Sequence, residues 1–347
     1  MPSCLLYALF AIWGERKLSA FIQDRLGPNE VGPKGLLQTF ADILKLMQKE
    51  DIVATANYSF IFKSAPYILF VVSFMAFALV PLGPQAVASN TNTGIYLLLA
   101  ILSIDIIGFL FGAWGSNNKF SILAGMRTVA QMFSFEIPLS LVVLGVVMLT
   151  ETMNLDAMTQ VQGVFSKAVW FGIDLRNFVG FFTWNIIAYP FVILGFVIFI
   201  ITALGEANRA PFDHAEAESE LIAGVFTEYS GFRFSIMALS EYIIMLLMGV
   251  LGAILFFGGY LSPLPNIGLI KLNDWTSGTL GEFSCYAWGY FWLMLKAIVW
   301  VCVCMWVRWT YPRVRIDQVM HLSWKVLTPA SLFFVFVCGV CKLIQVS

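Results

Sequence analysis

A run of carboxylates lies between two apolar segments, in residues 206–229. Its acids, accompanied by one arginine, Arg209, are Glu206, Asp213, Glu216, Glu218, Glu220 and Glu228. On a helix over residues 213–223, Asp213, Glu216 and Glu220 share one face, so their charges repel each other. Unless Arg209 and Arg233 compensate, such a group takes up and releases protons as a unit. The alternative is a solvated acidic loop, although apolar residues alternate with these acids and favour partial burial.

Three further acids, Asp105, Glu136 and Glu241, lie inside apolar stretches. An unpaired charge near the bilayer centre costs at least ~2.5 kcal/mol on insertion scales, so each acid must be neutral, paired or hydrated. For Glu136 we favour a proton that loads and leaves, because desolvation moves carboxyl titration toward neutral pH. For Asp105 and Glu241, proton handling and a structural hydrogen bond to a neighbouring helix stay equally open. Pro138 and Pro190 each remove a backbone donor and predict helix kinks, the first one beside Glu136.

The elements that carry these residues are predicted to be membrane helices. The chain has 347 residues, of which 59% are hydrophobic and 12% are charged, and its mean hydropathy is +0.83. This composition is unlike that of soluble domains and predicts an all-α integral membrane protein. A helix needs ~20 apolar residues to cross the hydrocarbon core. About eight transmembrane helices in a single membrane domain, 1–347, are therefore expected, at 2–22, 65–86, 94–115, 121–150, 181–204, 233–260, 286–309 and 322–345.

The basic residues predict the orientation of these helices, because lysine and arginine collect on the cytoplasmic side. Fifteen of the 20 lie around the connections after the first, third, fifth and seventh spans, so both termini are expected on the outer side. A net charge of −1 argues against a nucleic-acid partner. Cys338 and Cys341 form an isolated CxxC pair, and His214 and His321 lie far apart in the sequence, so no metal site is expected.

The loop 25–51, between the first two spans, opens with two Gly-Pro steps and continues into a short helix. One face of that helix is apolar and carries Leu36, Leu37, Phe40, Ile43, Leu44 and Met47. Such an amphipathic helix is expected to lie along the membrane surface. Two functions stay open for it: it covers the bundle, or it roofs an opening through which a lipid-soluble molecule enters.

Five long blocks, in order along the chain, carry a resemblance to a known family. They are ERK at 15–17, RLGPNEVGPKGLLQTFADILKLMQKED at 25–51, GSNNKFSILAGMRTVAQMFSFEIPL at 115–139, GEANRAPFDHAEAESEL at 205–221 and EYSGFRFSIMALSEY at 228–242. Together they resemble the quinone-tunnel membrane subunit of respiratory complex I, which lies at the junction with the peripheral arm and is called the H subunit in bacterial NADH:quinone oxidoreductase. His214 and Ala215 depart from this pattern, because the family usually shows an aliphatic residue and a proline there.

The resemblance implies a subunit of a proton-translocating NADH:quinone oxidoreductase in an energy-transducing membrane, expected to be the bacterial inner membrane. This chain is then expected to bind no redox cofactor, while FMN and the iron–sulfur clusters belong to partner subunits and quinone is the substrate. The expected partners are the peripheral-arm quinone-site subunits, adjacent membrane subunits, quinone and lipid. Two alternatives stay open, the equivalent subunit of a membrane-bound hydrogenase and a free-standing ion transporter.

The resemblance also implies roles for individual residues, with no catalytic centre in this chain itself. The quinone tunnel is expected to include Arg16, Lys17, Arg25, Arg209, Phe212 and Arg233. The acidic loop 205–232 is expected beside the quinone cavity. The proton path is expected to comprise Asp105, Glu136, Glu206, Asp213, Glu216, Glu218, Glu220, Glu228 and Glu241. Asp105 is not universal to the family, so its place on the path is a hypothesis about this chain.

Overall fold

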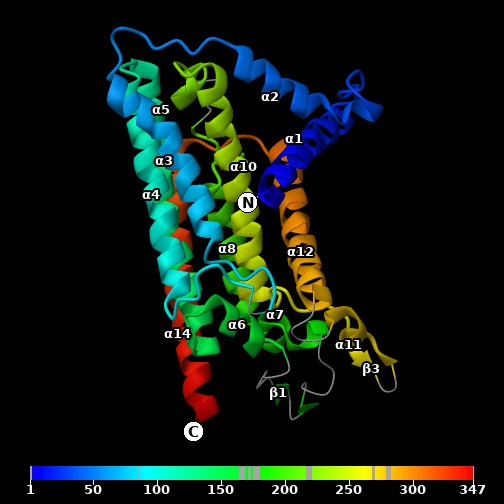
Figure 1. Ribbon diagram of the computed structural model, residues 1–347. Helices are drawn as coiled ribbons and strands as arrows, with labels where there is room; N and C mark the ends of the chain where they lie inside the picture. The colour runs from blue at the N-terminus through cyan, green and yellow to red at the C-terminus, as the bar shows by residue number, and fades with distance from the viewer. Residues whose placement is uncertain are drawn as a thin grey trace.

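Long apolar helices lie side by side in the computed structural model, which describes residues 2–84, 86–163, 169–170, 173–174, 180–215, 221–267, 270–278 and 283–346 (Figure 1). They are α1 (Pro2–Ile22), α3 (Ser59–Phe77), α4 (Gly94–Gly115), α5 (Lys119–Thr150), α8 (Val192–Glu206), α10 (Gly231–Phe256) and α12 (Phe283–Thr310). A last helix is continuous through α13 (Ile316–His321), the π-helical segment η5 (Leu322–Leu327) and α14 (Thr328–Val346).

Six of these helices, within the described ranges, are long and apolar enough to cross a membrane: α3, α4, α5, α10, α12 and the continuous α13–η5–α14. The remaining two differ from them for separate reasons. α1 has 21 residues but carries the charged triplet Glu15, Arg16 and Lys17. α8 has 15 residues, fewer than the ~20 that a span needs. With these two, the expected all-α membrane fold with about eight apolar helices is confirmed.

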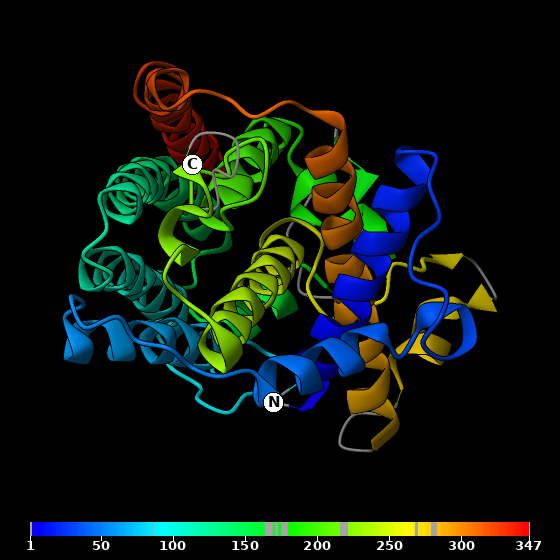
Figure 2. The same ribbon diagram turned by 90° about the horizontal axis from the view of Figure 1, so that it is seen from above.

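The middle of the bundle is occupied by α10, as the view from above shows (Figure 2). α3, α4, α5 and α14 lie on one side of it, and α1 and α12 lie on the other. Leu246, Leu247 and Phe256 of α10 are fully buried. A helix that is apolar on all faces avoids water either inside a bundle or within a membrane, and α10 does so at the centre of the bundle.

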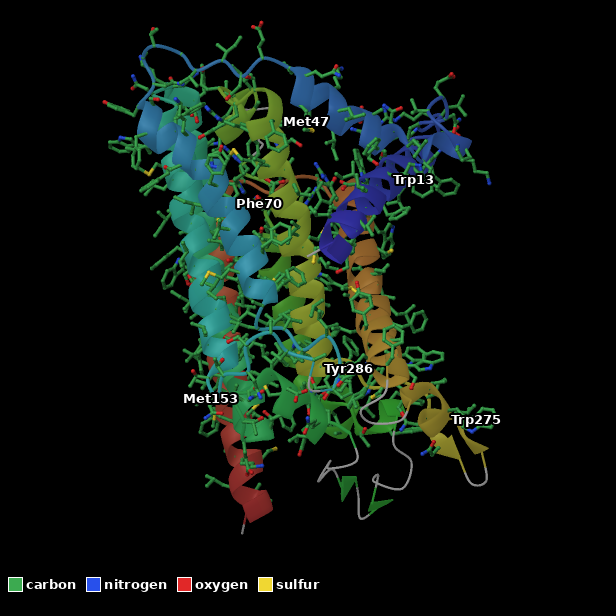
Figure 3. The ribbon with its side chains drawn as sticks, viewed as in Figure 1. Trp13, Met47, Phe70, Met153, Trp275 and Tyr286 are labelled. Atoms are coloured by element: carbon green, nitrogen blue, oxygen red, sulfur yellow. The ribbon has the colours of Figure 1, made fainter. Side chains whose placement is uncertain are left out.

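The two ends of the bundle differ in structure. The helix α2 (Gln38–Gln48), preceded by η1 (Pro33–Gly35), lies across one end, and the C-terminus lies at the other (Figure 1). Figure 3 places Met47 and Trp13 near the α2 end, and Met153, Tyr286 and Trp275 near the opposite end. The remaining short elements are α6 (Leu155–Val161), η3 (Gly180–Thr183), α7 (Asn185–Ala188), η4 (Gly224–Phe226), α11 (Leu272–Ser277) and two hairpins, β1 (Val169–Trp170) with β2 (Ile173–Asp174) and β3 (Asn266–Ile267) with β4 (Ile270–Lys271).

The amphipathic helix expected in loop 25–51 is present as α2. Its apolar side chains Phe40, Leu44 and Met47 are exposed in this chain alone, with 53%, 45% and 60% of their surface accessible. Large apolar groups gathered on one face are stable only when membrane or another protein covers them. The Asp42 carboxylate on the opposite face accepts a hydrogen bond from Arg16 of α1 at 2.5 Å, which ties α2 to the bundle.

Several expected helix bounds are wrong. The span expected at 233–260 ends at Phe256, and the last span, expected at 322–345, begins earlier, at Ile316. The span expected at 65–86 begins earlier, at Ser59, and ends at Phe77. The span expected at 181–204 is divided around Pro190 into α7 and α8, so the proline interrupts this helix instead of only kinking it. Proline has no N–H to donate and its ring clashes with the preceding turn, so the short α7 cannot continue through it.

Pro138, by contrast, lies inside an unbroken α5. A helical N–H at position 138 would bond to the carbonyl of Ser134, and proline cannot supply it. The Ser323 hydroxyl, in the π-helical segment η5, donates to that Ser134 carbonyl at 2.5 Å. A neighbouring helix therefore supplies the hydrogen bond that the proline removes, two residues before Glu136.

Candidate functional site

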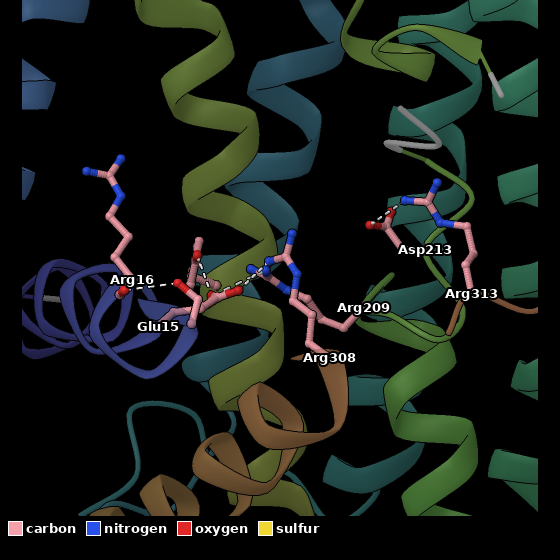
Figure 4. Close-up of polar contacts among 8 residues, drawn as sticks. Glu15, Arg16, Arg209, Asp213, Arg308 and Arg313 are labelled. Carbon is pink, nitrogen blue, oxygen red and sulfur yellow. Dashed lines mark hydrogen bonds and ion pairs between the residues drawn. The ribbon is translucent and has the colours of Figure 1, made fainter. Parts of the chain in front are cut away.

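Glu15 of α1 is the centre of a buried polar cluster, with only 4% of its surface exposed (Figure 4). Tyr242 of α10 donates its hydroxyl hydrogen to Glu15 Oε2 at 2.6 Å. Arg308 of α12 donates from Nη1 to Glu15 Oε1 at 2.5 Å. Because the three residues come from three helices, this cluster ties α1 and α12 to the central helix α10.

Arg209 completes the cluster from the loop that follows α8. Its Nη1 lies 3.6 Å from Glu15 Oε2, and its guanidinium carbon lies 4.2 Å from the centre of the Tyr242 ring. Its Nε and Nη2 atoms find no hydrogen-bond partner among the residues that the structure describes, although the side chain is buried. Two arginines thus face one carboxylate, and buried donors without partners remain available to a polar acceptor.

The sequence pointed to Arg209 as a site residue, whereas the roles of Glu15 and Arg308 were missed. Glu15 lies within a block that resembles the family, and Arg308 is one of the basic residues that set the orientation. The signal was present, because an ionisable residue inside or at the end of an apolar span requires a partner. What the sequence does not contain is which residues pair.

A second cluster consists of three acids from three neighbouring helices: Asp105 of α4, Glu136 of α5 and Glu206 at the end of α8. Glu206 lies close enough to the other two for their charges to interact. Asp105 is 1% exposed, and neither of its oxygens finds a hydrogen-bond partner among the described residues. The Ser103 hydroxyl donates to Glu136 Oε1. The fold therefore gathers these three predicted proton-path residues in one place.

The acidic loop is only partly described, since Glu216, Glu218 and Glu220 lie outside the described residues. Asp213 is 5% exposed. Its Oδ2 lies 3.3 Å from Nη2 of Arg313, a residue in the connection between α12 and α13. Glu228 accepts a hydrogen bond of 2.8 Å from Asn118, the residue that caps the N-terminus of α5. Both ends of the loop are thus tied to other parts of the bundle, and for these two residues the structure shows partial or full burial instead of a free solvated loop.

Glu241 lies on α10 directly before Tyr242, and its carboxylate interacts electrostatically with the guanidinium of Arg209. It therefore belongs electrostatically to the cluster around Glu15. His214, next to Asp213, is buried, and its Nδ1 lies 2.5 Å from Oε1 of Gln131 in α5. Burial lowers the pKa of His214 from its ordinary value. A hydrogen bond to the Phe212 backbone and the charge of Asp213 oppose this effect, while the charges of Arg313 and Arg127 add to it.

The expected tunnel residues fall into separate places. The Lys17 ammonium donates to Asn29 Oδ1 at 2.6 Å, and Nη2 of Arg233 lies 2.8 Å from Oδ2 of Asp51. Both basic groups therefore hold the loop around α2 to the bundle, as Arg16 does through Asp42. Arg25 is exposed beyond the end of α1. Phe212 is 5% exposed and lies inside the core. Its ring packs edge-on against that of Phe135, with 5.1 Å between the two ring centres.

An open groove of about 390 Å³ lies between α1 and α3, lined by Leu5, Phe70, Val71, Phe74 and Met75. All five side chains are apolar, so the groove suits a hydrocarbon chain. Among the described residues, no three His, Cys, Asp or Glu side chains gather closely enough to hold a metal ion.

Comparison with known proteins gives a consistent result along the chain. The model of the family described as NADH dehydrogenase matches residues 1–339. A second H subunit of the NADH-quinone oxidoreductase of Cytophaga hutchinsonii is 49% identical, over 97% of this chain and 95% of its own length. The NADH-quinone oxidoreductase H subunits of Chlorobaculum parvum and Anoxybacillus flavithermus are 48% and 40% identical, over 94% and 97% of this chain and 86% and 90% of their own lengths. The resemblance carried by the five sequence blocks is confirmed, and the chain belongs to the NADH dehydrogenase family.

Proposed function

We propose that this chain is the membrane subunit of a proton-pumping NADH-quinone oxidoreductase that forms part of the quinone tunnel and couples quinone reduction to proton movement. The names of its relatives support the oxidoreductase, and they favour neither the hydrogenase nor the free-standing transporter. The coupling role is supported mainly by the position of the short segment 206–209, which connects two polar clusters. Its first residue, Glu206, belongs to the cluster of buried acids, and its last, Arg209, belongs to the cluster around Glu15.

The cluster around Glu15 is suited to the polar head of a quinone. Quinone oxygens are hydrogen-bond acceptors, and Arg209 has buried donors without partners among the described residues. The two arginines also oppose the negative charge that forms when a quinone takes up electrons. The apolar groove between α1 and α3 offers contact for a hydrocarbon tail. In this proposal Arg16, Lys17, Arg25, Phe212 and Arg233 belong to the tunnel or support its wall.

A charge formed near this cluster acts on nearby acids over a limited range. Two unit charges 4 Å apart interact by about 4 kcal/mol at an effective dielectric constant near 20, and by about half of that at twice the distance. One unit of pKa corresponds to ~1.4 kcal/mol, so acids within this range exchange protons in response. Acids further away respond only through a relay. The proposed relay consists of Glu206, Asp213, Glu216, Glu218, Glu220 and Glu228 in the loop, with Glu241, Asp105 and Glu136 in the bundle.

The proposal assigns electron transfer to partner subunits of the peripheral arm, which hold FMN and the iron–sulfur clusters. This chain supplies the tunnel wall and the acids, and it contacts adjacent membrane subunits and lipid. We place it in the bacterial inner membrane with both termini on the outer side. The distribution of basic residues supports that orientation, and so does the position of the C-terminus at the end opposite α2 (Figure 1).

The test of this function is Glu136→Gln, with Glu151→Gln as its matched control. Glu151 follows the last residue of the same helix, pairs with Lys342 at 2.8 Å, and has 53% of its side chain exposed. We expect Glu136→Gln to assemble normally but to lose roughly tenfold or more of NADH-driven quinone reduction and proton pumping, since a positioned proton-transfer group contributes about 10²- to 10⁴-fold. Electron transfer from NADH to ferricyanide, which needs no quinone, monitors the peripheral arm.

The control variant is expected to retain all three activities. If Glu136→Gln pumps and reduces quinone like the unmodified enzyme, Glu136 is not on the proton path. If membranes without this chain keep full quinone reductase activity, the proposed function itself is wrong.

A further inference from the structure

The segment that follows α2 lies against the end of the acidic loop and the start of α10. The hydroxyl oxygen of Ser230 accepts a hydrogen bond of 3.3 Å from the backbone N–H of Ile52. The same hydroxyl donates to the carbonyl of Glu50 at 3.4 Å. In the first turn of α10, Nη2 of Arg233 lies 2.8 Å from Oδ2 of Asp51. Three consecutive residues after α2 therefore bind this short segment, and together these interactions form the α2–α10 contact.

The backbones approach each other closely at the α2–α10 contact. Gly231, the first residue of α10, has a φ of +59°, in the left-handed region that favours glycine. A Cβ atom at this position would lie 3.0 Å from the carbonyl oxygen of Lys49, the residue that caps the C-terminus of α2. Any larger side chain at position 231 would therefore push the end of α2 away. The end of α2 and the start of α10 are thus shaped to fit each other.

The two residues before Ser230 tie the same segment to further helices. Tyr229 is buried, and its ring stacks on that of Phe62 in α3, with 4.2 Å between the ring centres. Its hydroxyl donates to the Phe62 carbonyl at 2.9 Å. Glu228 is held by Asn118, the cap of α5, at 2.8 Å. Because these residues follow one another directly in the chain, the position of α2 and the position of Glu228, a proposed proton-path acid, are set together.

The opposite side of α2 is anchored on α1. Asp42 accepts a hydrogen bond of 2.5 Å from Arg16, and the indole of Trp13 donates to the carbonyl of Lys34, in η1, at 3.4 Å. α2 thus lies across the end of the bundle from α1 to α10 (Figure 1). Since α1 and α3 line the apolar groove, α2 is fixed to one wall through α1 and to the other through residues 229–233.

We propose that Asp51 and Arg233 are positioning residues that hold α2 and the end of the acidic loop together as one unit. Arg233 acts on α2 through Asp51, and Asp51 acts on residues 228–232 through Arg233. While the pair is formed, α2 keeps its place across the groove and Glu228 keeps its place beside α5. Without it, the two parts move independently. The inference rests on the proposed function, since it assigns positioning residues to the same tunnel and proton path.

Four variants separate the pairing of these residues from a direct effect of either charge. Asp51→Asn and Arg233→Gln each remove one charge and keep a polar side chain. The double variant Asp51→Asn, Arg233→Gln removes both charges. The exchange Asp51→Arg, Arg233→Asp restores two opposite charges. Asp317→Asn is the matched control, because Asp317 is exposed on α13 and lies outside the α2–α10 contact.

The experiment uses membranes that contain the assembled enzyme. It measures the apparent KM for a decyl-tailed quinone and the number of protons pumped per NADH oxidised. Neither quantity depends on the amount of enzyme, so a merely structural defect that lowers assembly leaves both unchanged. NADH-driven reduction of ferricyanide monitors the amount of working peripheral arm.

The side chains of Arg233 and Asp51 are 14% and 38% exposed, so the pair is partly screened by water. We expect each single variant to raise KM by about twofold to fivefold, the range that partly exposed ion pairs contribute, and to lower the number of protons per NADH. The double variant should lose no more than either single variant, because all three remove one shared interaction. The charge exchange should recover most of the loss, and Asp317→Asn should behave like the unmodified enzyme.

Several results would overturn the inference. An unchanged KM in Asp51→Asn does so even when Arg233→Gln is impaired, because the arginine then acts on the quinone directly. A charge exchange that is no better than the single variants shows that pairing is not responsible. A raised KM with an unaltered number of protons per NADH shows that the acidic loop does not follow α2. Failure of the proposed function is distinguishable, since quinone reduction then persists in membranes that lack this chain.

Discussion

Ser323→Ala is expected to destabilise the chain through a single buried carbonyl. Pro138 leaves the carbonyl of Ser134 without its helical donor, and the Ser323 hydroxyl supplies a bond of 2.5 Å in a fully buried position. Removal of that hydroxyl leaves a buried acceptor unsatisfied, which costs about 1–3 kcal/mol of the free energy of unfolding. The double variant Pro138→Ala, Ser323→Ala restores a backbone N–H to the same carbonyl. In that background the serine substitution should cost less than about 1 kcal/mol.

The assay is a double-mutant cycle on the purified chain in detergent, with the free energy of unfolding measured for the four proteins. A coupling energy of about 1–2 kcal/mol between the two positions is expected from the single shared acceptor. Equal costs of Ser323→Ala with proline and with alanine at position 138 would refute the reasoning. Because Glu136 is two residues before Pro138, the single variant Ser323→Ala is also expected to reduce quinone-driven pumping, while the double variant recovers part of it.

Three further predictions concern single side chains. Lys296→Met should cost about 3 kcal/mol of unfolding free energy, because the buried ammonium donates to three carbonyls in the segment that follows α10, at 2.7–2.8 Å; a cost below about 1 kcal/mol contradicts this. Glu15→Gln should cost about 3–5 kcal/mol by leaving two arginines without their carboxylate, measured the same way, and an unchanged value argues against the ion pairs. For His214, burial lowers the pKa of the folded chain, so the unfolded chain binds the proton first. Its contribution to stability is therefore complete above about pH 6.5 and is lost as the pH falls through the lower folded value. A titration of unfolding free energy in which His214→Asn keeps the same acid slope would show that another group is responsible.

Much of the fold follows from local sequence alone. Runs of ~20 apolar residues predict spans because the bilayer provides no hydrogen-bond partners for the backbone, and only a helix satisfies them internally. The apolar spacing in residues 36–47 predicted α2 for a similarly local reason, since one face must leave water. The same reasoning failed around Pro190, because periodicity does not show whether a proline kinks a helix or ends it. Pro138 illustrates the difference, as a donor from a distant helix compensates for it.

For the candidate site, the sequence by itself determined which residue types were available: buried acids, one arginine in the acidic run, and a histidine where an aliphatic residue was expected. Only the tertiary structure decided which of them meet. Glu15 and Arg308 are separated by 293 positions, and Gln131 and His214 by 83, yet each pair lies 2.5 Å apart. Periodicity reports which face of a helix is apolar, whereas such contacts depend on how whole helices pack against one another. The free energy of an ion pair or a proton site changes over a few ångströms, and that distance is set by packing.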